Sequence, residues 1–360
     1  MWQGRSRPCA RSSGRSSTSP DASEPFVADA GRNTSEGNLR GRGRRARRRE
    51  PAEDREVDQA LDAMSAAELR AVVRAVLDQL DDGVKDSVID TLMTRGTKTK
   101  SGWKPARPSP RIVEEAMSFA EAARHIGRAD PDDVTEHLRR ATKAFLAGDH
   151  ASARAVFEAI LPPIASVDID LSQHELVEEM LGVDARACVA QYVASVYTTT
   201  PLRDRADAIV RAIDQVQGVG TLSSPIRDME DASPGALPDL GVFLPLWVKR
   251  LQRFRPPKDE WETEHERWLR EAIFRVDGVD GLERIARQTR RPRACLAWCE
   301  ALADQGNWTA ALKACDAAAR LVRHRTGGVN SLTEPHSRLR SLAGPICPSG
   351  WKSRGARLLR

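Results

Sequence analysis

Three cysteines have the type and spacing that could support chemistry. Cys295 and Cys299 lie four residues apart on an expected helix, and Cys315 lies on the next one. Neighbouring thiols can bind a soft metal ion or react with oxidants. However, no histidine lies within these two helices, and the cysteines occupy positions where small residues pack. We therefore interpret them as compact hydrophobic residues of a core.

A second candidate is the segment that runs from His174 to Glu178, which begins like the zinc-binding helix of metalloproteases. That helix needs a second histidine four residues after the first, so that both imidazoles share one face. Here the fourth residue is Glu178, and this pair can bind a metal ion only weakly. Ser172 and Glu175 match a capping box. We interpret the segment as the start of a helix.

The sequence contains no motif for nucleophilic, phosphate or dinucleotide chemistry. It has no Gly-x-Ser-x-Gly turn, and no Lys directly follows a Gly, which excludes a P-loop. Asp168 and Asp170 are paired carboxylates without a recognisable acid–base partner, so we assign them a loop or capping role. Trp261 and Trp268 lie seven residues apart on one expected helix and favour core packing. We expect no catalytic residue, no metal ligand and no cofactor, and predict that the protein is not an enzyme.

Charge is concentrated at the two ends of the chain. Residues 1–50 contain 12 Arg and five acidic residues, a net charge of +7, and residues 321–360 also carry +7. Because the whole chain carries +5, residues 51–320 carry −9. An arginine-rich stretch can contact phosphates without sequence preference. The candidate nucleic-acid contacts are Arg40, Arg42, Arg44, Arg45, Arg47, Arg48 and Arg49.

Composition divides the chain into five segments. Residues 1–50 and 323–360 resemble disordered basic tails. Between them we expect a helical hairpin over 51–93, a linker over 94–108 and a helical body over 109–322. The sequence has neither a run of about 18 apolar residues nor a secretory signal, so we expect a cytoplasmic protein with no membrane contact. The Arg- and Ala-rich composition is typical of a GC-rich bacterial genome.

Helix-capping signals and apolar residues at helical spacing predict an all-α fold. Ser109-Pro110, Asp130-Pro131 and Thr200-Pro201 are typical helix starts, while Gly127 and Gly148 mark helix ends. Residues 218–241 form the longest stretch without such a signal. Short connections predict antiparallel neighbours. The expected helices of the body include 112–126, 130–148, 150–161, 200–216, 244–254, 258–275, 280–289, 293–305 and 308–322.

Two segments of the body match each other at a shift of 158 residues, Ala144–Leu161 and Leu302–Ala319. The shift pairs Gly148 with Gly306, Asp149 with Asn307, His150 with Trp308, Ala153 with Ala311, Phe157 with Cys315, and Ile160 with Ala318. This pattern resembles the tetratricopeptide repeat, in which a Gly-polar-aromatic turn joins two antiparallel helices. The resemblance implies stacked helix pairs, with Cys299 at the small position of the second copy. Arg140 departs from the pattern, because an apolar residue usually packs there.

A second, fainter resemblance concerns only the composition and arrangement of the expected helices. The acidic helices rich in Ala, Leu and Arg are similar to the helical regions that accompany SWIM zinc fingers in bacterial multidomain proteins. The finger needs Cys-x-Cys and Cys-x-His, and neither spacing occurs here, so no zinc ligand is implied.

We therefore expect a non-enzymatic scaffold that binds a protein or peptide through a groove of helical repeats. The alternative is a nucleic-acid-associated protein that uses the arginine-rich tail. Salt dependence separates the two hypotheses, because tail-driven binding to nucleic acid weakens steeply with salt.

Overall fold

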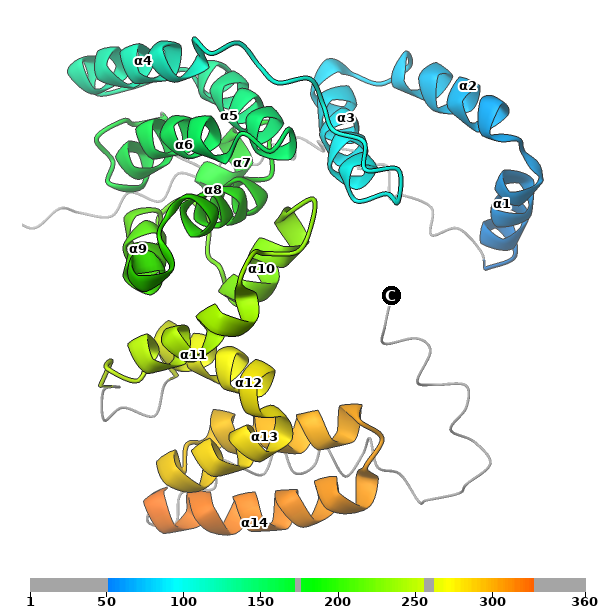
Figure 1. Ribbon diagram of the computed structural model, residues 1–360. Helices are drawn as coiled ribbons and strands as arrows, with labels where there is room; N and C mark the ends of the chain where they lie inside the picture. The colour runs from blue at the N-terminus through cyan, green and yellow to red at the C-terminus, as the bar shows by residue number, and fades with distance from the viewer. Residues whose placement is uncertain (1–50, 172–175, 256–261, 327–360) are drawn as a thin grey trace, which may run out of the picture. The chain divides into compact units, whose positions relative to one another are not determined.

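Helices make up all the regular structure in the part of the chain that the structure describes. A computed structural model describes residues 51–171, 176–255 and 262–326, and these residues form 14 helices and no strand. The all-α prediction is therefore confirmed for these residues. The helices are α1 (Pro51–Ala63), α2 (Ala66–Leu77), α3 (Asp82–Thr97), α4 (Ile112–Ile126), α5 (Pro131–Leu146), α6 (His150–Ala165), α7 (Val177–Met180), α8 (Ala185–Thr199), α9 (Leu202–Gln215), α10 (Pro225–Ala232), α11 (Leu240–Leu251), α12 (Glu264–Thr289), α13 (Pro292–Asp304) and α14 (Trp308–Thr326) (Figure 1).

The chain divides into two units after Ser65, so that α1 belongs to the first unit and α2–α14 belong to the second. Residues 51–93, expected as a hairpin of two helices, form α1, α2 and most of α3. The apolar side chains of α2 and α3 are largely exposed, with Val76 at 49% and Val84 at 51%. The arginine-rich stretch of residues 40–49 lies outside the described residues, and the expected C-terminal tail begins within α14.

Two hydrophobic cores occupy the second unit. The larger core extends from α4 to the first half of α12 and includes Tyr192 and Trp247. The smaller core is formed by the second half of α12 with α13 and α14, and includes Leu282 and Trp298. Gly278 separates the two halves of α12 with φ 61° and ψ −146°. Residues with a Cβ rarely adopt this conformation, so the glycine permits the kink.

The turn between α5 and α6 has the geometry that the sequence predicts. Gly148 has φ 84°, and its N–H donates to the carbonyl of Phe145 at 3.0 Å. The N–H of Asp149 donates to the carbonyl of Ala144 at 2.9 Å. These two bonds form a Schellman motif, which satisfies the last carbonyls of α5. The carboxylate of Asp149 then caps α6 by accepting the N–H of Ser152 at 3.2 Å.

The turn between α13 and α14 repeats this geometry bond for bond. Gly306 has φ 73°, and its N–H donates to the carbonyl of Ala303 at 2.8 Å. The N–H of Asn307 donates to the carbonyl of Leu302 at 3.0 Å. The side-chain oxygen of Asn307 accepts the N–H of Ala310 at 3.2 Å. The match at a shift of 158 residues therefore extends from sequence to backbone conformation at both turns.

Small buried residues follow each turn where the helices of the pair pack together. Ala153 on α6 is fully buried, and its counterpart Ala311 on α14 is 4% exposed. On the first helix of each pair, Ala141 and Cys299 are likewise buried. Small side chains allow two helix axes to approach within about 8–10 Å. Arg140, the departure from the repeat pattern, is partly exposed and forms ion pairs at the surface.

The second turn and helix pair give a direct stability test. Ala311→Leu is expected to lower the free energy of unfolding by about 1–3 kcal/mol, because a larger side chain overpacks the buried site. Gly306→Ala is expected to cost about 1 kcal/mol. A Cβ on Gly306 would meet no atom within 4 Å, so its cost comes from the positive φ alone. Urea denaturation of the full chain measures both effects, and a neutral Ala311→Leu would show that α13 and α14 do not cross there.

The sequence-based prediction of helix ends is wrong at some prolines and glycines, where the helix continues or a new helix begins. α6 continues through Pro162 and Pro163 to Ala165. The Pro162 carbonyl accepts the N–H of Ser166 at 2.9 Å, and the Pro163 carbonyl accepts that of Ile169 at 3.0 Å. Because these carbonyls are satisfied and Pro163 is buried, the core stabilises the extra turn.

Two further differences concern the second half of the chain. The stretch 218–241, expected to be irregular, contains α10, which begins at Pro225. The expected helices 258–275 and 280–289 form one element, α12, which begins after Thr263 and kinks at Gly278. A capping box between Thr263 and Glu266 sets that start.

Three histidines make the stability of the fold sensitive to acid. Burial lowers the pKa of His137, His150 and His265. The unfolded chain therefore binds more protons than the folded chain near the unfolded pKa of about 6.5, and stability falls as the pH falls through that value. We expect a lower melting temperature at pH 5.5 than at pH 7.5. His150→Phe should weaken the dependence of the melting temperature on pH, whereas the same change at the exposed His125 should not. Equal slopes of melting temperature against pH in the two variants would contradict the account.

Candidate functional site

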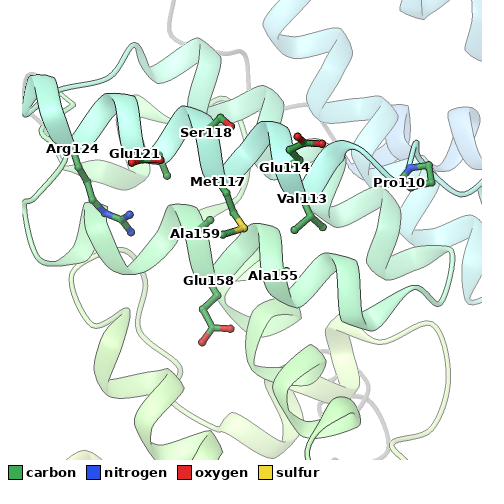
Figure 2. Close-up of a pocket in the computed structure, with 11 residues that line it drawn as sticks. Pro110, Val113, Glu114, Met117, Ser118, Glu121, Arg124, Ala155, Glu158 and Ala159 are labelled. Carbon is green, nitrogen blue, oxygen red and sulfur yellow. The ribbon is translucent and has the colours of Figure 1, made fainter.

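An open groove of about 990 Å³ runs between α4 and α6. Val113 and Met117 extend from α4 toward α6, where Ala155 and Ala159 lie (Figure 2). The floor of the groove is therefore apolar, and the two small alanines leave room beside Met117. The lining residues are Pro110, Val113, Glu114, Met117, Ser118, Ala120, Glu121, Arg124, Ala155, Glu158 and Ala159.

Helical spacing on α4 separates the groove face from the core face. Ala116 on the core face is fully buried, and Ala120, which is also fully buried, forms part of the groove lining. Val113, Met117 and Glu121 form a neighbouring row at four-residue spacing, and Met117 is 59% exposed. An unbranched methionine can adapt its shape to different apolar partners. The groove thus presents an adaptable apolar side chain that the fold itself does not bury.

Acidic side chains surround this apolar floor. Glu114, Glu121 and Glu158 line the groove, and all three are exposed. Glu158 pairs with Arg154 at 3.4 Å. Within the described part of the chain, Glu114 and Glu121 have no ion-pair partner within 4.0 Å. The negative charge of these two side chains is therefore available to an approaching cation.

A second groove, of about 590 Å³, adjoins the first at Arg124, which lines both. Pro162 and Pro163 of α6 line it, together with Asp168 and Asp214. Arg124 is the single basic residue among those that line the two grooves, which contain five carboxylates. The combined surface is negative and favours a positively charged partner.

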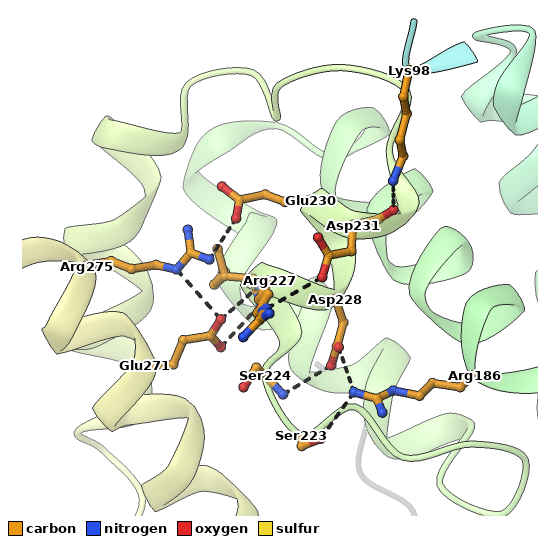
Figure 3. A network of polar contacts seen from close by, with 11 residues as sticks. Lys98, Arg186, Ser223, Ser224, Arg227, Asp228, Glu230, Asp231, Glu271 and Arg275 are labelled. Atoms are coloured by element: carbon orange, nitrogen blue, oxygen red, sulfur yellow. Dashed lines mark hydrogen bonds and ion pairs between the residues drawn. The ribbon is translucent and has the colours of Figure 1, made fainter. Parts of the chain in front are cut away.

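A polar network holds α10 between neighbouring helices (Figure 3). The carboxylate of Glu271 on α12 accepts the N–H of Arg227 at 2.8 Å and the N–H of Ile226 at 3.4 Å. It therefore caps the N-terminus of α10 from another helix. Burial raises the pKa of Glu271, while these backbone donors oppose the rise.

Ion pairs complete the same network. Arg275 on α12 lies 2.7 Å from Glu230, and Arg186 on α8 lies 2.8 Å from Asp228 (Figure 3). The ammonium group of Lys98 donates to the backbone carbonyl of Asp231. Because each carboxylate here already binds a guanidinium or backbone N–H, we interpret the network as structural rather than catalytic.

The residues that the sequence analysis singled out do not gather at one place. Trp268 is fully buried and donates its indole N–H to the carbonyl of Leu222 at 3.0 Å, so its assignment to the core is confirmed. Asp168 accepts the hydroxyl of Ser166 at 2.8 Å in the turn that follows α6. Outside the described residues lie Arg40, Arg42, Arg44, Arg45, Arg47, Arg48, Arg49, Ser172, His174, Glu175 and Trp261.

Of the cysteines that the structure describes, Cys188 lies in the larger core, and Cys295, Cys299 and Cys315 belong to the smaller core. Cys188, Cys295 and Cys299 are buried, whereas Cys315 is partly exposed. The packing role assigned to Cys295 and Cys299 agrees with this burial. Among the described residues, no group of three or more His, Cys, Asp or Glu side chains is arranged to hold a metal ion.

The groove between α4 and α6 was missed by sequence reasoning, although a signal for it was present. Met117 lies outside the row of core residues on α4, with Val113 and Glu121 four residues to either side.

The described helices include none that is both long and apolar enough to span a membrane. The chain matches no protein-family model, no curated protein and no solved structure.

Proposed function

We propose that the protein is a non-enzymatic scaffold that binds a partner protein or peptide through the groove between α4 and α6. The observation that carries the proposal is the exposed Met117 on the apolar floor of a groove of about 990 Å³. Exposed apolar surface with a polar rim is typical of an interaction site. The unpaired carboxylates of Glu114 and Glu121 favour a segment in which basic residues flank apolar ones.

A tetratricopeptide-like arrangement of helix pairs is part of the same proposal. It is supported by the matched turns at Gly148 and Gly306 and by the buried alanines that follow them. α6 packs against α4, α5 and α8, as an inner helix of a stacked array would. Such arrays expose extended surfaces to their partners.

Selection from a peptide library tests the proposed function and requires no named partner. The probe is a phage-displayed library of random peptides selected on the full chain, and each enriched peptide is then tested for binding to the variant Met117→Arg. We expect enriched peptides with Lys or Arg beside apolar residues, whose binding weakens as salt rises. The control Val242→Arg changes an exposed residue of α11 that does not line the groove and should retain binding. Enriched peptides that bind both variants equally would contradict the proposal.

Association with nucleic acid through the arginine-rich tail is the alternative function, because seven arginines lie within residues 40–49. A fluorescent single-stranded DNA of mixed sequence is a suitable probe. If all seven arginines neutralise phosphates, the logarithm of the binding constant should fall with a slope of about −5 against the logarithm of the salt concentration. Removal of residues 1–50 should abolish this binding. Binding that survives the deletion would contradict the alternative.

A further inference from the structure

An occupant of the groove between α4 and α6 must combine apolar side chains with positive charge. The apolar floor contains Val113 and the exposed Met117. Carboxylates flank this floor from both sides, with Glu114 and Glu121 on α4 and Glu158 on α6 (Figure 2). Because the floor is apolar and the rim is negative, an occupant that has only one of the two properties matches only part of the surface.

Residues 351–360 of the same chain have both properties. Their sequence is Trp-Lys-Ser-Arg-Gly-Ala-Arg-Leu-Leu-Arg, with four basic residues and no acidic one. Trp351, Leu358 and Leu359 supply large apolar side chains between the basic ones. Tryptophan and arginine are also the residues most enriched among those that dominate binding at protein interfaces. The segment therefore matches the floor and the rim of the groove together.

The arginine-rich stretch near the other end of the chain matches the charge alone. Residues 40–49 consist of seven Arg, two Gly and one Ala, so a single methyl group is their only apolar side chain. This stretch can neutralise the glutamates of the rim, but it has nothing large enough to cover Met117. Comparison of the two basic segments thus favours residues 351–360 as the occupant of the groove.

The connection between α14 and this segment is long. Residues 327–350 supply 24 residues after the end of α14, and the groove, α14 and the segment belong to the same unit of the chain. Fully extended, 24 residues span at most about 80 Å. A tethered segment reaches an effective concentration on the order of 1 mM, so a contact with a dissociation constant of about 0.1 mM occupies its site about 90% of the time. A weak contact is therefore sufficient.

We propose that residues 351–360 bind in the groove between α4 and α6 of their own chain and compete there with the partner. The proposal rests on the proposed function, because it assigns an occupant to the same groove. The basic side chains neutralise the glutamates of the rim, and the apolar side chains cover Met117. A partner must displace the segment before it can bind, so the chain limits access to its own groove.

Paramagnetic broadening in the full chain tests the proposal. A nitroxide is attached to Cys347, which lies four residues before the start of the segment. Cys9→Ser and Cys315→Ser remove the other accessible thiols, since the three remaining cysteines are buried. We expect the Met117 methyl signal to lose intensity and to recover when ascorbate reduces the nitroxide. An unbroadened Met117 signal in the folded protein would overturn the proposal.

A matched control removes the apolar side chains of the segment and keeps its charge. The alanine variant combines Trp351→Ala, Leu358→Ala and Leu359→Ala, and the broadening of Met117 should be lost in it. Undiminished broadening in the alanine variant would contradict the apolar contact. Chains that carry the nitroxide are also mixed with methyl-labelled chains that lack it. Broadening in this mixture would identify a second copy as the source of the segment and overturn the proposal.

Competition in chains with their natural cysteines gives a second readout. A labelled peptide selected on the groove should bind the alanine variant about 10-fold more tightly than the parent, because the tethered competitor is lost. Removal of residues 1–50 should leave this affinity unchanged, and a gain on that removal alone would identify the arginine-rich stretch as the occupant. If a peptide shifts the Met117 signal with equal affinity in parent and alanine variant, the inference fails and the proposed function stands. If Met117 is broadened but no library peptide binds there, the proposed function fails and the inference stands.

Discussion

Arg291→Ala is expected to lower the free energy of unfolding by about 1.5–3 kcal/mol, because it removes two charge-assisted hydrogen bonds from a carboxylate that is largely shielded from solvent. Arg291 is 7% exposed, and its guanidinium contacts both carboxylate oxygens of Glu266, at 2.8 Å and 2.9 Å. It precedes α13, while Glu266 lies in the first turn of α12. The pair thus joins the starts of two helices that pack together. Urea denaturation of the full chain measures the loss.

An exposed ion pair on α12, the helix that contains Glu266, supplies the control. Arg284 lies 2.7 Å from Asp277, and both side chains are at least 40% exposed. Arg284→Ala should therefore change the free energy of unfolding by no more than about 0.5 kcal/mol. Arg291→Lys should give an intermediate loss, because an ammonium group cannot form the two parallel hydrogen bonds of a guanidinium. Equal effects of Arg291→Ala and Arg284→Ala would contradict the role assigned to burial.

Met117→Arg is expected to weaken binding of a selected groove peptide by about 30-fold or more, the effect of losing a central contact residue. The change replaces the exposed apolar side chain at the groove floor with a charge of the same sign as the expected partner. Because Met117 is 59% exposed, the free energy of unfolding of the variant should lie within about 0.5 kcal/mol of that of the parent. Fluorescence anisotropy with a labelled peptide measures the affinity.

The conservative change Met117→Leu tests whether an apolar side chain of similar volume is sufficient for binding. It should keep affinity within a few-fold of the parent, since Leu and Met have similar volumes. Glu121→Gln should weaken binding mainly at low salt, because it removes one rim charge while leaving the floor intact. Tight binding by Met117→Arg would show that the groove floor is not the contact surface.

Helix ends set by local chemistry were predictable from the sequence. Asp130 followed by proline begins α5, where its carboxylate accepts the N–H of Asp132 at 2.9 Å. Gly127 and Gly148 end helices with φ of 80° and 84°. In each case the signal acts within about one helical turn, so the rest of the fold is not needed to interpret it.

Other features depend on contacts that no local pattern contains. Pro163 stays helical in a buried position of the core, which the local sequence does not reveal. α10 is capped by Glu271, which lies 44 residues after Arg227 in the chain. The groove depends on which row of side chains on α4 is covered by α6. The spacing of apolar residues in the sequence does not show which of two neighbouring rows is covered. The valines of α2 illustrate the same point, because they recur at helical spacing and yet Val72, Val73 and Val76 are exposed.

The most direct measurement of the central claim is a methyl NMR titration of the full chain labelled at its methionine methyl groups, with a peptide selected on the groove as the probe. The chain contains six methionines, so the spectrum is simple to assign by substitution. The scaffold account predicts that the Met117 methyl signal shifts in proportion to peptide bound, while that of the fully buried Met229 does not. Saturating peptide that leaves the Met117 signal unchanged would contradict the claim that the groove between α4 and α6 is the binding surface.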